Sequence, residues 1–389
     1  MVIIYGIYKL VKKPEDADTI IIITCGFLNF ITEYALNKIK EFQEYDAELI
    51  VAGCVPDIDK EELAKVFNGT TLTTKELNEK IEKIFPPQNN VKFKDIPDAN
   101  ILFKNYEDIP SDKSVKKLRF IENIYSKIEN FVFRHLLEKY SVGYQFSKRQ
   151  YHIRISWGCK GNCSYCAIKK AVGPLRSKPL DECIKEFKKG LENNYKNFVL
   201  DATDVGLYGI DIGNSFPEIL DEMTKIPGEY KISIRELHPV WIVKYADELE
   251  KIVKRNKILI FDVALQSANT RILKLMNRYS NVDKMKEAIL KIKKSATDMF
   301  LTIECIVGFP TETWDEFLDT TNFIKEVDSS GGQIYLFSCK TGTEAEKIEP
   351  KLSEVEMNRR AEYAKKLLKK EGYLVSYNSK EKVLDFIKK

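Results

Sequence analysis

The sequence predicts an α/β protein, with a small parallel α/β domain at the N-terminus followed by six strand–helix units. Three observations support this. Short apolar runs alternate with amphipathic helical patterns along most of the 389 residues. Several of the runs are unbroken by polar residues, as is typical of parallel strands that are covered on both faces. A loop with three cysteines directly follows the first strand of the larger domain, where parallel α/β folds place their functional loops.

The N-terminal domain is predicted over residues 1–108. Its expected strands are Val2–Tyr5, Thr19–Thr24 and Ala47–Ala52, and its expected helices are Asn29–Phe42 and Lys60–Phe67. A connector follows over residues 109–148. Within it, apolar residues recur at helical spacing over Lys116–Tyr140, which predicts a helix packed on a domain. A helix that binds a partner or a membrane surface is the alternative.

The larger domain is predicted over residues 149–350. Its expected strands are His152–Ser156, Asn197–Leu200, Tyr230–Ile234, Ile258–Val263, Phe300–Val307 and Gln333–Phe337, separated by amphipathic helices such as Leu180–Asn193 and Val282–Lys293. Residues 351–389 are predicted to form a helical tail. That tail holds eleven Lys or Arg against six Asp or Glu, so it is either a solvated helix face or a contact to phosphates.

Composition and charge narrow the class of protein. Hydrophobic residues make up 44% and charged residues 31%, as in ordinary soluble globular proteins. No apolar run reaches membrane-spanning length and no signal peptide precedes the first strand, so we expect a cytoplasmic protein without a membrane partner. The eight cysteines are then expected to be thiols or metal ligands rather than disulfides. A net charge of +4 permits an RNA partner without requiring one.

The cysteine loop carries the strongest chemical signal. Cys159, Cys163 and Cys166 form a C-x3-C-x2-C triplet. Three thiolates on one short loop can bind three irons of a [4Fe–4S] cluster and leave the fourth iron open. A structural zinc site is the alternative, but zinc usually takes four closed ligands, and neither His152 nor Cys183 completes a usual zinc knuckle.

Several further segments, in order, resemble the radical S-adenosylmethionine methylthiotransferases, over about Asp16–Pro56 and Tyr151–Gly372. The stretch Asp201–Gly213 is most similar to the branch that modifies threonylcarbamoyladenosine in tRNA, where this loop ends T-G-x-Y-G-x-D-I-G. The other segments are Gly158–Pro179 with Gly173-Pro174-Leu175-Arg176-Ser177, Leu265-Gln266-Ser267, Met276-Asn277-Arg278-Tyr279, Val307-Gly308-Phe309-Pro310-Thr311-Glu312-Thr313 and Thr341-Gly342-Thr343. The resemblance implies a partial (β/α)6 barrel of the radical-SAM type.

The resemblance also implies a set of cofactor contacts. S-adenosylmethionine would bind the open iron of the Cys159/Cys163/Cys166 cluster, and the reduced cluster would split it to give a 5′-deoxyadenosyl radical. The residues expected to bind the cofactor are Arg176, Asp201, Asp204, Gln266, Ser267, Gly308, Phe309 and Pro310. Taken singly, each has a plainer interpretation as a surface, capping or strand-end residue. No catalytic residue is assigned.

Methylthiotransferases carry three N-terminal cysteines for a second [4Fe–4S] cluster. The segments around Cys25 and Cys54 resemble the second and third of these, but Ile7 stands where the first should follow Tyr5-Gly6. We therefore expect a shortened N-terminal domain with an incomplete auxiliary site, to which a partner chain could add a ligand. We also expect no C-terminal RNA-binding (TRAM) domain. Cys339, at the end of the sixth strand, is either a buried packing residue or a stray ligand.

Three functions stay open from the sequence. The first is methylthiolation of N6-threonylcarbamoyladenosine 37 in tRNA, with a second S-adenosylmethionine as methyl donor and an electron donor protein as partner. The second is another radical reaction, on a protein or a small molecule, without sulfur insertion. The third is a non-catalytic subunit that binds a cluster and the cofactor.

Overall fold

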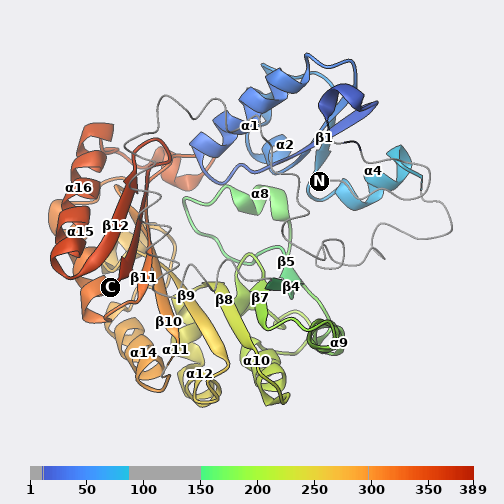
Figure 1. The fold of residues 1–389 in the computed structure, drawn as a ribbon. Coiled ribbons are helices and arrows are strands. Elements are labelled where there is room, and N and C mark those ends of the chain that lie inside the picture. Colours follow the sequence, from blue (N-terminus) through green and yellow to red (C-terminus); the bar gives the residue numbers. More distant parts are fainter. Residues whose placement is uncertain (1–10, 12, 87–149, 297) are drawn as a thin grey trace. The chain divides into compact units, whose positions relative to one another are not determined.

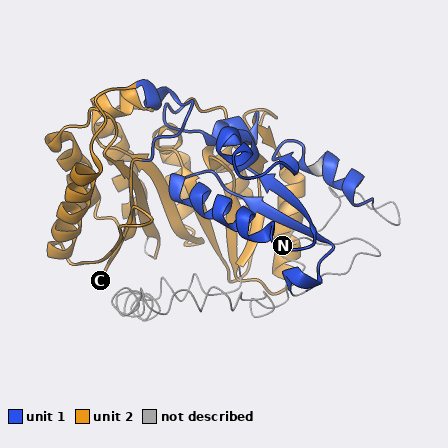
Figure 2. Cartoon of the chain, turned by 90° about the horizontal axis from the view of Figure 1, so that it is seen from above, with its two compact units in different colours: residues 1–102, 163–174, 338–347 blue, residues 103–162, 175–337, 348–389 orange. Residues whose placement is uncertain are grey.

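The structure is a computed structural model that describes residues 11, 13–86, 150–296 and 298–389 (Figure 1). The predicted elements Val2–Tyr5 and Lys116–Tyr140 lie outside the described residues, as do the predicted domain limits at residues 108 and 148, which stay predictions. The chain divides into two compact units (Figure 2). Unit 1 combines Met1–Leu102, Cys163–Pro174 and Ser338–Lys347, and unit 2 combines Phe103–Asn162, Leu175–Phe337 and Ile348–Lys389.

Unit 1 contains a three-stranded parallel sheet in the order β1-β2-β3. Its elements are β1 (Thr19–Thr24), α1 (Asn29–Phe42), β2 (Glu48–Gly53), α2 (Val55–Ile58), α3 (Lys60–Ala64), β3 (Thr70–Thr73) and α4 (Leu77–Ile84), after a 3-10 turn at Pro14–Asp16. The predicted strand Thr19–Thr24 and helix Asn29–Phe42 are confirmed, and the other predicted strand and helix are shifted or shortened by one to three residues. α8 (Ile168–Val172) and the 3-10 turn Glu344–Lys347 complete the unit.

Both faces of this small sheet are covered, which explains the unbroken apolar strands. Ile39 of α1 packs with Leu49 and Val51 on one face of β2. Ile50 and Ala52 point to the other face of the same strand, where they pack with Leu72 and Ile81. Successive side chains of a strand alternate between the two faces of the sheet. When both faces are covered, every position of the strand is buried, so apolar residues are favoured throughout.

Unit 2 is built on an eight-stranded sheet in the order β12-β13-β11-β10-β9-β8-β7-β4. Six of its strands are parallel, namely β4 (Gln150–Arg154), β7 (Asn197–Asp201), β8 (Lys231–Leu237), β9 (Ile258–Gln266), β10 (Phe300–Val307) and β11 (Gly331–Leu336). All six predicted strands are therefore present, and the α/β class is confirmed. The first is shifted by two residues toward the N-terminus, because β4 ends at Arg154 and Ser156 belongs to the separate strand β5 (Ser156–Trp157).

Helices pack against one face of this sheet (Figure 1). They are α9 (Leu180–Glu192), α10 (Phe216–Lys225), α11 (Pro239–Lys244), α12 (Ala246–Val253), α13 (Thr270–Leu275), α14 (Val282–Lys294), α15 (Trp314–Glu326) and α16 (Glu354–Lys370). β10 shows the two faces clearly: Ile303 and Cys305 lie in the helix-covered core, whereas Thr302 and Glu304 line a cavity on the opposite face. Cys183 and Cys305 are both fully buried, as expected for packing residues.

The predicted helical tail is corrected by the structure. α16 ends at Lys370, and two antiparallel strands follow, β12 (Tyr373–Asn378) and β13 (Val383–Lys388). β13 then pairs antiparallel with β11 and so extends the sheet. The first of these strands follows a period of two, in which Tyr373 and Val375 are buried and Leu374 between them is half-buried, whereas β13 buries most of its apolar residues. In the sequence, the many charged residues of 351–389 favoured a helical tail, so this alternation was not recognised.

Candidate cluster and cofactor site

The cysteine loop is closed at its base by a short hairpin. β5 pairs antiparallel with β6 (Arg176–Ser177), with Trp157 opposite Arg176. The Arg176 guanidinium lies 5.0 Å from the centroid of the Trp157 ring, within range of a cation–π contact. Arg176 is thus exposed but held on an aromatic face, beside the loop that carries the three predicted cluster ligands.

The three predicted ligands have the chemistry that an iron–sulfur cluster requires. Cys159, Cys163 and Cys166 are half-buried and take part in no disulfide. The amide of Gly161 donates a hydrogen bond to Cys159 Sγ at 3.1 Å, an interaction that stabilises a thiolate. Within the described residues, no three His, Cys, Asp or Glu side chains are grouped to hold a metal ion. A [4Fe–4S] cluster requires a wider arrangement of ligands than a single metal ion, because each thiolate binds its own iron.

Asp201 and Asp204 follow β7 but differ in their surroundings. Asp201 Oδ2 lies 2.9 Å from His152 Nδ1. Asp204 accepts hydrogen bonds from Trp241 Nε1 at 2.9 Å and from the Gly206 amide at 3.0 Å. Burial raises the pKa of Asp204, and these donors oppose the rise. Both Asp204 oxygens are therefore used inside the fold, where they hold the loop after β7.

The structure joins two segments that were singled out separately in the sequence. Ser177 Oγ accepts a hydrogen bond from the Gly209 amide at 2.9 Å, and the Ser177 amide donates to Asp211 Oδ2 at 2.8 Å. The loop after β7 is thus tied to the hairpin that closes the cysteine loop. Its tip leaves Ile210 and Ile212 exposed, at 37% and 43%.

Gln266 and Ser267 end β9, and only Gln266 has capacity for a ligand. Gln266 has a left-handed backbone, with φ of 71°, and its buried Oε1 has no hydrogen-bond partner in the described part of the chain. Such strain together with an unsatisfied buried acceptor is typical of a binding site. Ser267 is instead fully buried, accepts from the Asn269 amide at 3.2 Å and lies 3.4 Å from Thr320 Oγ1.

Gly308, Phe309 and Pro310 follow β10 and are all buried. The Phe309 ring is fully enclosed and makes an edge-to-face contact with Phe337, with centroids 5.3 Å apart. In this structure it therefore packs in the interior rather than forming an exposed aromatic wall. Gly308 has φ of +85°, and a Cβ there would lie 2.6 Å from Met357 Cγ of α16. Met357 therefore packs directly against Gly308, and a side chain at this position would not fit.

Sequence reasoning missed a buried ion pair behind this turn. Glu312 Oε2 accepts from Arg360 Nη1 at 2.6 Å and from the Gly308 amide at 2.8 Å, and Arg360 Nη2 donates to the Glu312 carbonyl at 2.9 Å. Burial raises the pKa of Glu312 to about 7, against the opposing effect of these donors. Glu312 lies within the motif Val307–Thr313, whereas nothing in the sequence distinguishes Arg360 from the other charged residues of its helix.

A second missed feature is an acid-lined cavity of about 460 Å³ on the inner face of β8 to β11. Its lining includes Glu236, Asp262, Glu304 and Asp385, together with Arg235. Burial raises the pKa of all four carboxyls, and the neighbouring acids raise those of Glu236 and Glu304 further. In the sequence, Asp262 and Glu304 were only positions of expected strands, Arg235 and Glu236 followed the end of one, and Asp385 lay in the expected helical tail.

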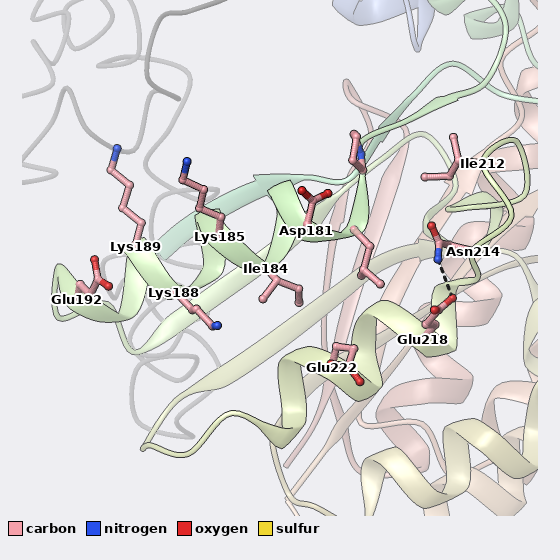
Figure 3. Close-up of a pocket in the computed structure, with 12 residues that line it drawn as sticks. Asp181, Ile184, Lys185, Lys188, Lys189, Glu192, Ile212, Asn214, Glu218 and Glu222 are labelled. Carbon is pink, nitrogen blue, oxygen red and sulfur yellow. Dashed lines mark hydrogen bonds between the residues drawn. The ribbon is translucent and has the colours of Figure 1, made fainter.

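A larger cavity, of about 980 Å³, is a groove between α9 and α10 (Figure 3). Lys185, Lys188 and Lys189 line it beside acidic residues such as Glu218, which accepts a hydrogen bond from Asn214 Nδ2 at 3.1 Å. It contains none of the predicted cofactor or cluster residues. We therefore do not assign it to the site.

The two N-terminal cysteines are brought together at one edge of the small sheet. Thr24 pairs with Gly53, so Cys25 and Cys54 follow neighbouring strand ends, and the Cys54 amide donates to the Thr24 carbonyl at 3.0 Å. Burial raises the pKa of the Cys54 thiol, a contact with Thr74 lowers it and the neighbouring Cys25 adds to the rise. In the sequence, only the resemblance to the methylthiotransferases assigned these two cysteines to one site.

Comparison with known proteins agrees with this geometry. Residues 153–324 match the Radical SAM superfamily, and residues 4–74 match "Uncharacterized protein family UPF0004". The fold resembles the radical S-adenosylmethionine methyltransferase TsrM from Kitasatospora setae, with a TM-score of 0.55 at 11% identity, over 82% of this chain and 63% of that one. The fold and the cysteine loop thus define an enzyme of the radical-SAM class.

Two relatives define the family. The ribosomal protein uS12 methylthiotransferase RimO of Clostridioides difficile is 32% identical over 364 residues, which cover 91% of this chain and 74% of that protein. A probable threonylcarbamoyladenosine tRNA methylthiotransferase of Archaeoglobus fulgidus is 28% identical over 340 residues, with 87% and 72% covered. The chain belongs to the radical S-adenosylmethionine methylthiotransferase family. Its cofactors are accordingly a [4Fe–4S] cluster and S-adenosylmethionine.

Among the described residues, no helix is both long enough and apolar enough to cross a membrane.

Proposed function

We propose that this chain methylthiolates N6-threonylcarbamoyladenosine 37 in tRNA, in the cytoplasm. The observation that carries the proposal is the loop Asp204–Gly213, whose sequence is most similar to the tRNA branch of the family. Its exposed Ile210 and Ile212 are available to a bound macromolecule, and Ser177 ties it to the cysteine loop. A substrate base must be unstacked for such chemistry, which a tRNA loop permits.

In this proposal Cys159, Cys163 and Cys166 hold the radical cluster. When bound, the cluster and S-adenosylmethionine supply the radical that removes hydrogen from an unactivated carbon. The chain's own groups would position the cofactor: Gln266 Oε1 would accept a hydrogen bond from it, and the Gly308 turn would hold the strand end beside it. An electron donor protein completes the reaction as a partner.

Sulfur insertion needs a second cluster, and unit 1 offers a place for it. Cys54 packs against a small core of Ile58, Ala167 and Ala171. Ala167 directly follows the cluster ligand Cys166. The edge of the sheet that carries Cys25 and Cys54 is thus a neighbour of the segment that follows Cys163 and Cys166, which belongs to the same unit.

Ribosomal protein uS12 is a second candidate substrate, favoured by the 32% identity to a relative with that activity.

Mass spectrometry of both substrates distinguishes them. In a strain without the gene, tRNA nucleosides should lose the 2-methylthio form of N6-threonylcarbamoyladenosine. The intact gene should restore it, and a gene with Cys159, Cys163 and Cys166 all changed to Ala should not. Loss of the methylthio group from uS12 instead would establish the second candidate.

If both substrates keep their modification while the purified chain makes 5′-deoxyadenosine, the enzyme performs another radical reaction. If it makes none under strong reductant, it is a binding subunit.

A further inference from the structure

The second cluster of the family needs three thiolates, and two are evident in the N-terminal part of unit 1. Ile7 occupies the position that follows Tyr5-Gly6. The segment Ser338–Lys347 belongs to the same unit, although it comes from the other end of the chain. It carries Cys339, which is half-buried and lies shortly after the end of β11.

Hydrogen bonds fix Cys339 beside the start of α1. The Asn29 amide donates to Ser338 Oγ at 3.2 Å, and Asn29 Nδ2 donates to the Cys339 carbonyl at 3.1 Å. Asn29 is the first residue of α1 and is separated from Cys25 only by a short turn. The backbone of Cys339 is therefore held at the same edge of the sheet as Cys25.

A buried ion pair fixes the next residue to the turn that follows Cys54. Lys340 is 2% exposed, and its Nζ lies 3.0 Å from Asp59 Oδ2 and 2.9 Å from Thr32 Oγ1. Asp59 ends α2, the helix that Cys54 caps at its start. A Cβ on Gly26, the residue after Cys25, would lie 3.4 Å from the same Asp59 oxygen. Neighbours of all three cysteines thus meet around Asp59.

We propose that Cys25, Cys54 and Cys339 hold a second [4Fe–4S] cluster, with Cys339 in place of the missing N-terminal ligand. This rests on the proposed sulfur insertion, for which such a cluster is needed. Each thiolate of a [4Fe–4S] cluster binds a separate iron, so the three sulfurs would surround the cluster at a wider spacing than the ligands of a single metal ion, which is the grouping that the described residues lack. Three protein thiolates would leave one iron open for the sulfur to be transferred.

Iron and sulfide analysis after anaerobic reconstitution tests the proposal. The intact chain should hold about eight irons, and the variant with Cys159, Cys163 and Cys166 changed to Ala should hold about four. Adding Cys339→Ser to that variant should remove most of these four and abolish the electron paramagnetic resonance signal of the reduced cluster. Adding Cys25→Ser instead should have the same effect. Cys183→Ser, buried in α9, is the matched control and should keep about four irons.

Two results would overturn the proposal. If the variant with Cys339→Ser keeps about four irons and an unchanged spectrum, Cys339 is not a ligand, while the proposed methylthiolation stands. If the variant with the radical-cluster cysteines removed holds no iron although the intact chain holds about four, no second cluster forms and sulfur insertion by this chain fails with it. Circular dichroism of each variant shows whether lost iron reflects lost folding.

Discussion

Glu312 is the buried side chain that fixes the turn after β10. Its carboxylate joins the Gly308 amide to Arg360 of α16, so a strand end expected to bind cofactor depends on a helix far along the chain. Glu312 is a positioning residue in this account, because it acts through the backbone of Gly308.

Changing Glu312 to Ala should lower the free energy of unfolding by about 3–5 kcal/mol, because it leaves Arg360 buried without its partner. Glu312→Gln keeps an acceptor for the Gly308 amide and should cost less, while it still weakens S-adenosylmethionine binding. Urea denaturation and calorimetric binding measure the two effects. Arg359→Ala, on the exposed face of the same helix, should change unfolding by at most about 0.5 kcal/mol. Equal binding by the Gln variant and the native chain would argue against a positioning role.

A change of Gln266 should separate an effect on cofactor binding from an effect on the stability of the fold. Its Oε1 has no partner inside the described fold, so Gln266→Ala should leave the midpoint of thermal unfolding unchanged. Loss of one hydrogen bond to the cofactor should weaken S-adenosylmethionine binding about threefold to tenfold. Ser267→Ala should show the reverse, with lower stability and unchanged affinity, because Ser267 bonds only within the fold. Unchanged affinity in Gln266→Ala would remove this residue from the cofactor site.

Among the elements, β1, α1 and β10 match their predicted bounds to the residue, whereas most of the others differ by one to three residues. β1 is a run of isoleucines and α1 has apolar residues at helical spacing, and both match their predicted bounds. β3, with the sequence Thr-Thr-Leu-Thr, buries only Leu72, so it has no period to detect. α2 is a single turn around Pro56. Such elements owe their structure to neighbours in the fold, which the local sequence does not record.

The same limit applies to the site. The cysteine triplet and the strand-end motifs could be located from spacing alone. The contacts of Ser177 with Gly209 and Asp211, and of Cys339 with Asn29, join segments that are distant in sequence. No single segment contains the information that brings them together.

The pairing of β1 with β2 makes a prediction at the scale of elements. Gly53 has φ of +102°, and a Cβ there would lie 2.4 Å from the Thr24 carbonyl oxygen. Gly53→Ala should therefore separate the strand ends that carry Cys25 and Cys54, and lower the iron content of the variant that lacks the radical-cluster cysteines. Gly213→Ala is the control: it has a similar φ of +77° but open space around it, so it should cost only about 1–2 kcal/mol and no iron. Full iron content in Gly53→Ala would show that this edge holds no cluster.

Across the whole molecule, the acid-lined cavity predicts the pH dependence of stability. Burial, and then the charges of Asp262 and Glu236, hold the pKa of Glu304 well above its ordinary value. At this side chain the folded state therefore binds more protons than the unfolded state above about pH 4.5, and the contribution of Glu304 to the free energy of unfolding should fall as the pH rises from there through the folded pKa. Glu304→Gln should flatten this fall, whereas Glu381→Gln on the surface should not. Denaturation curves from pH 5 to 9 that are unchanged by Glu304→Gln would contradict this account of the cavity.

The central claim is that one chain combines a radical cluster on Cys159, Cys163 and Cys166 with a barrel that binds and cleaves S-adenosylmethionine. The most direct test is the formation of 5′-deoxyadenosine, measured by chromatography and mass spectrometry, from the reconstituted protein with S-adenosylmethionine and a strong reductant. The account predicts product from the native chain and from Cys183→Ser, and none above background from the single changes of Cys159, Cys163 or Cys166 to Ala. Undiminished product from any of these three variants, or none from the native chain, would contradict it.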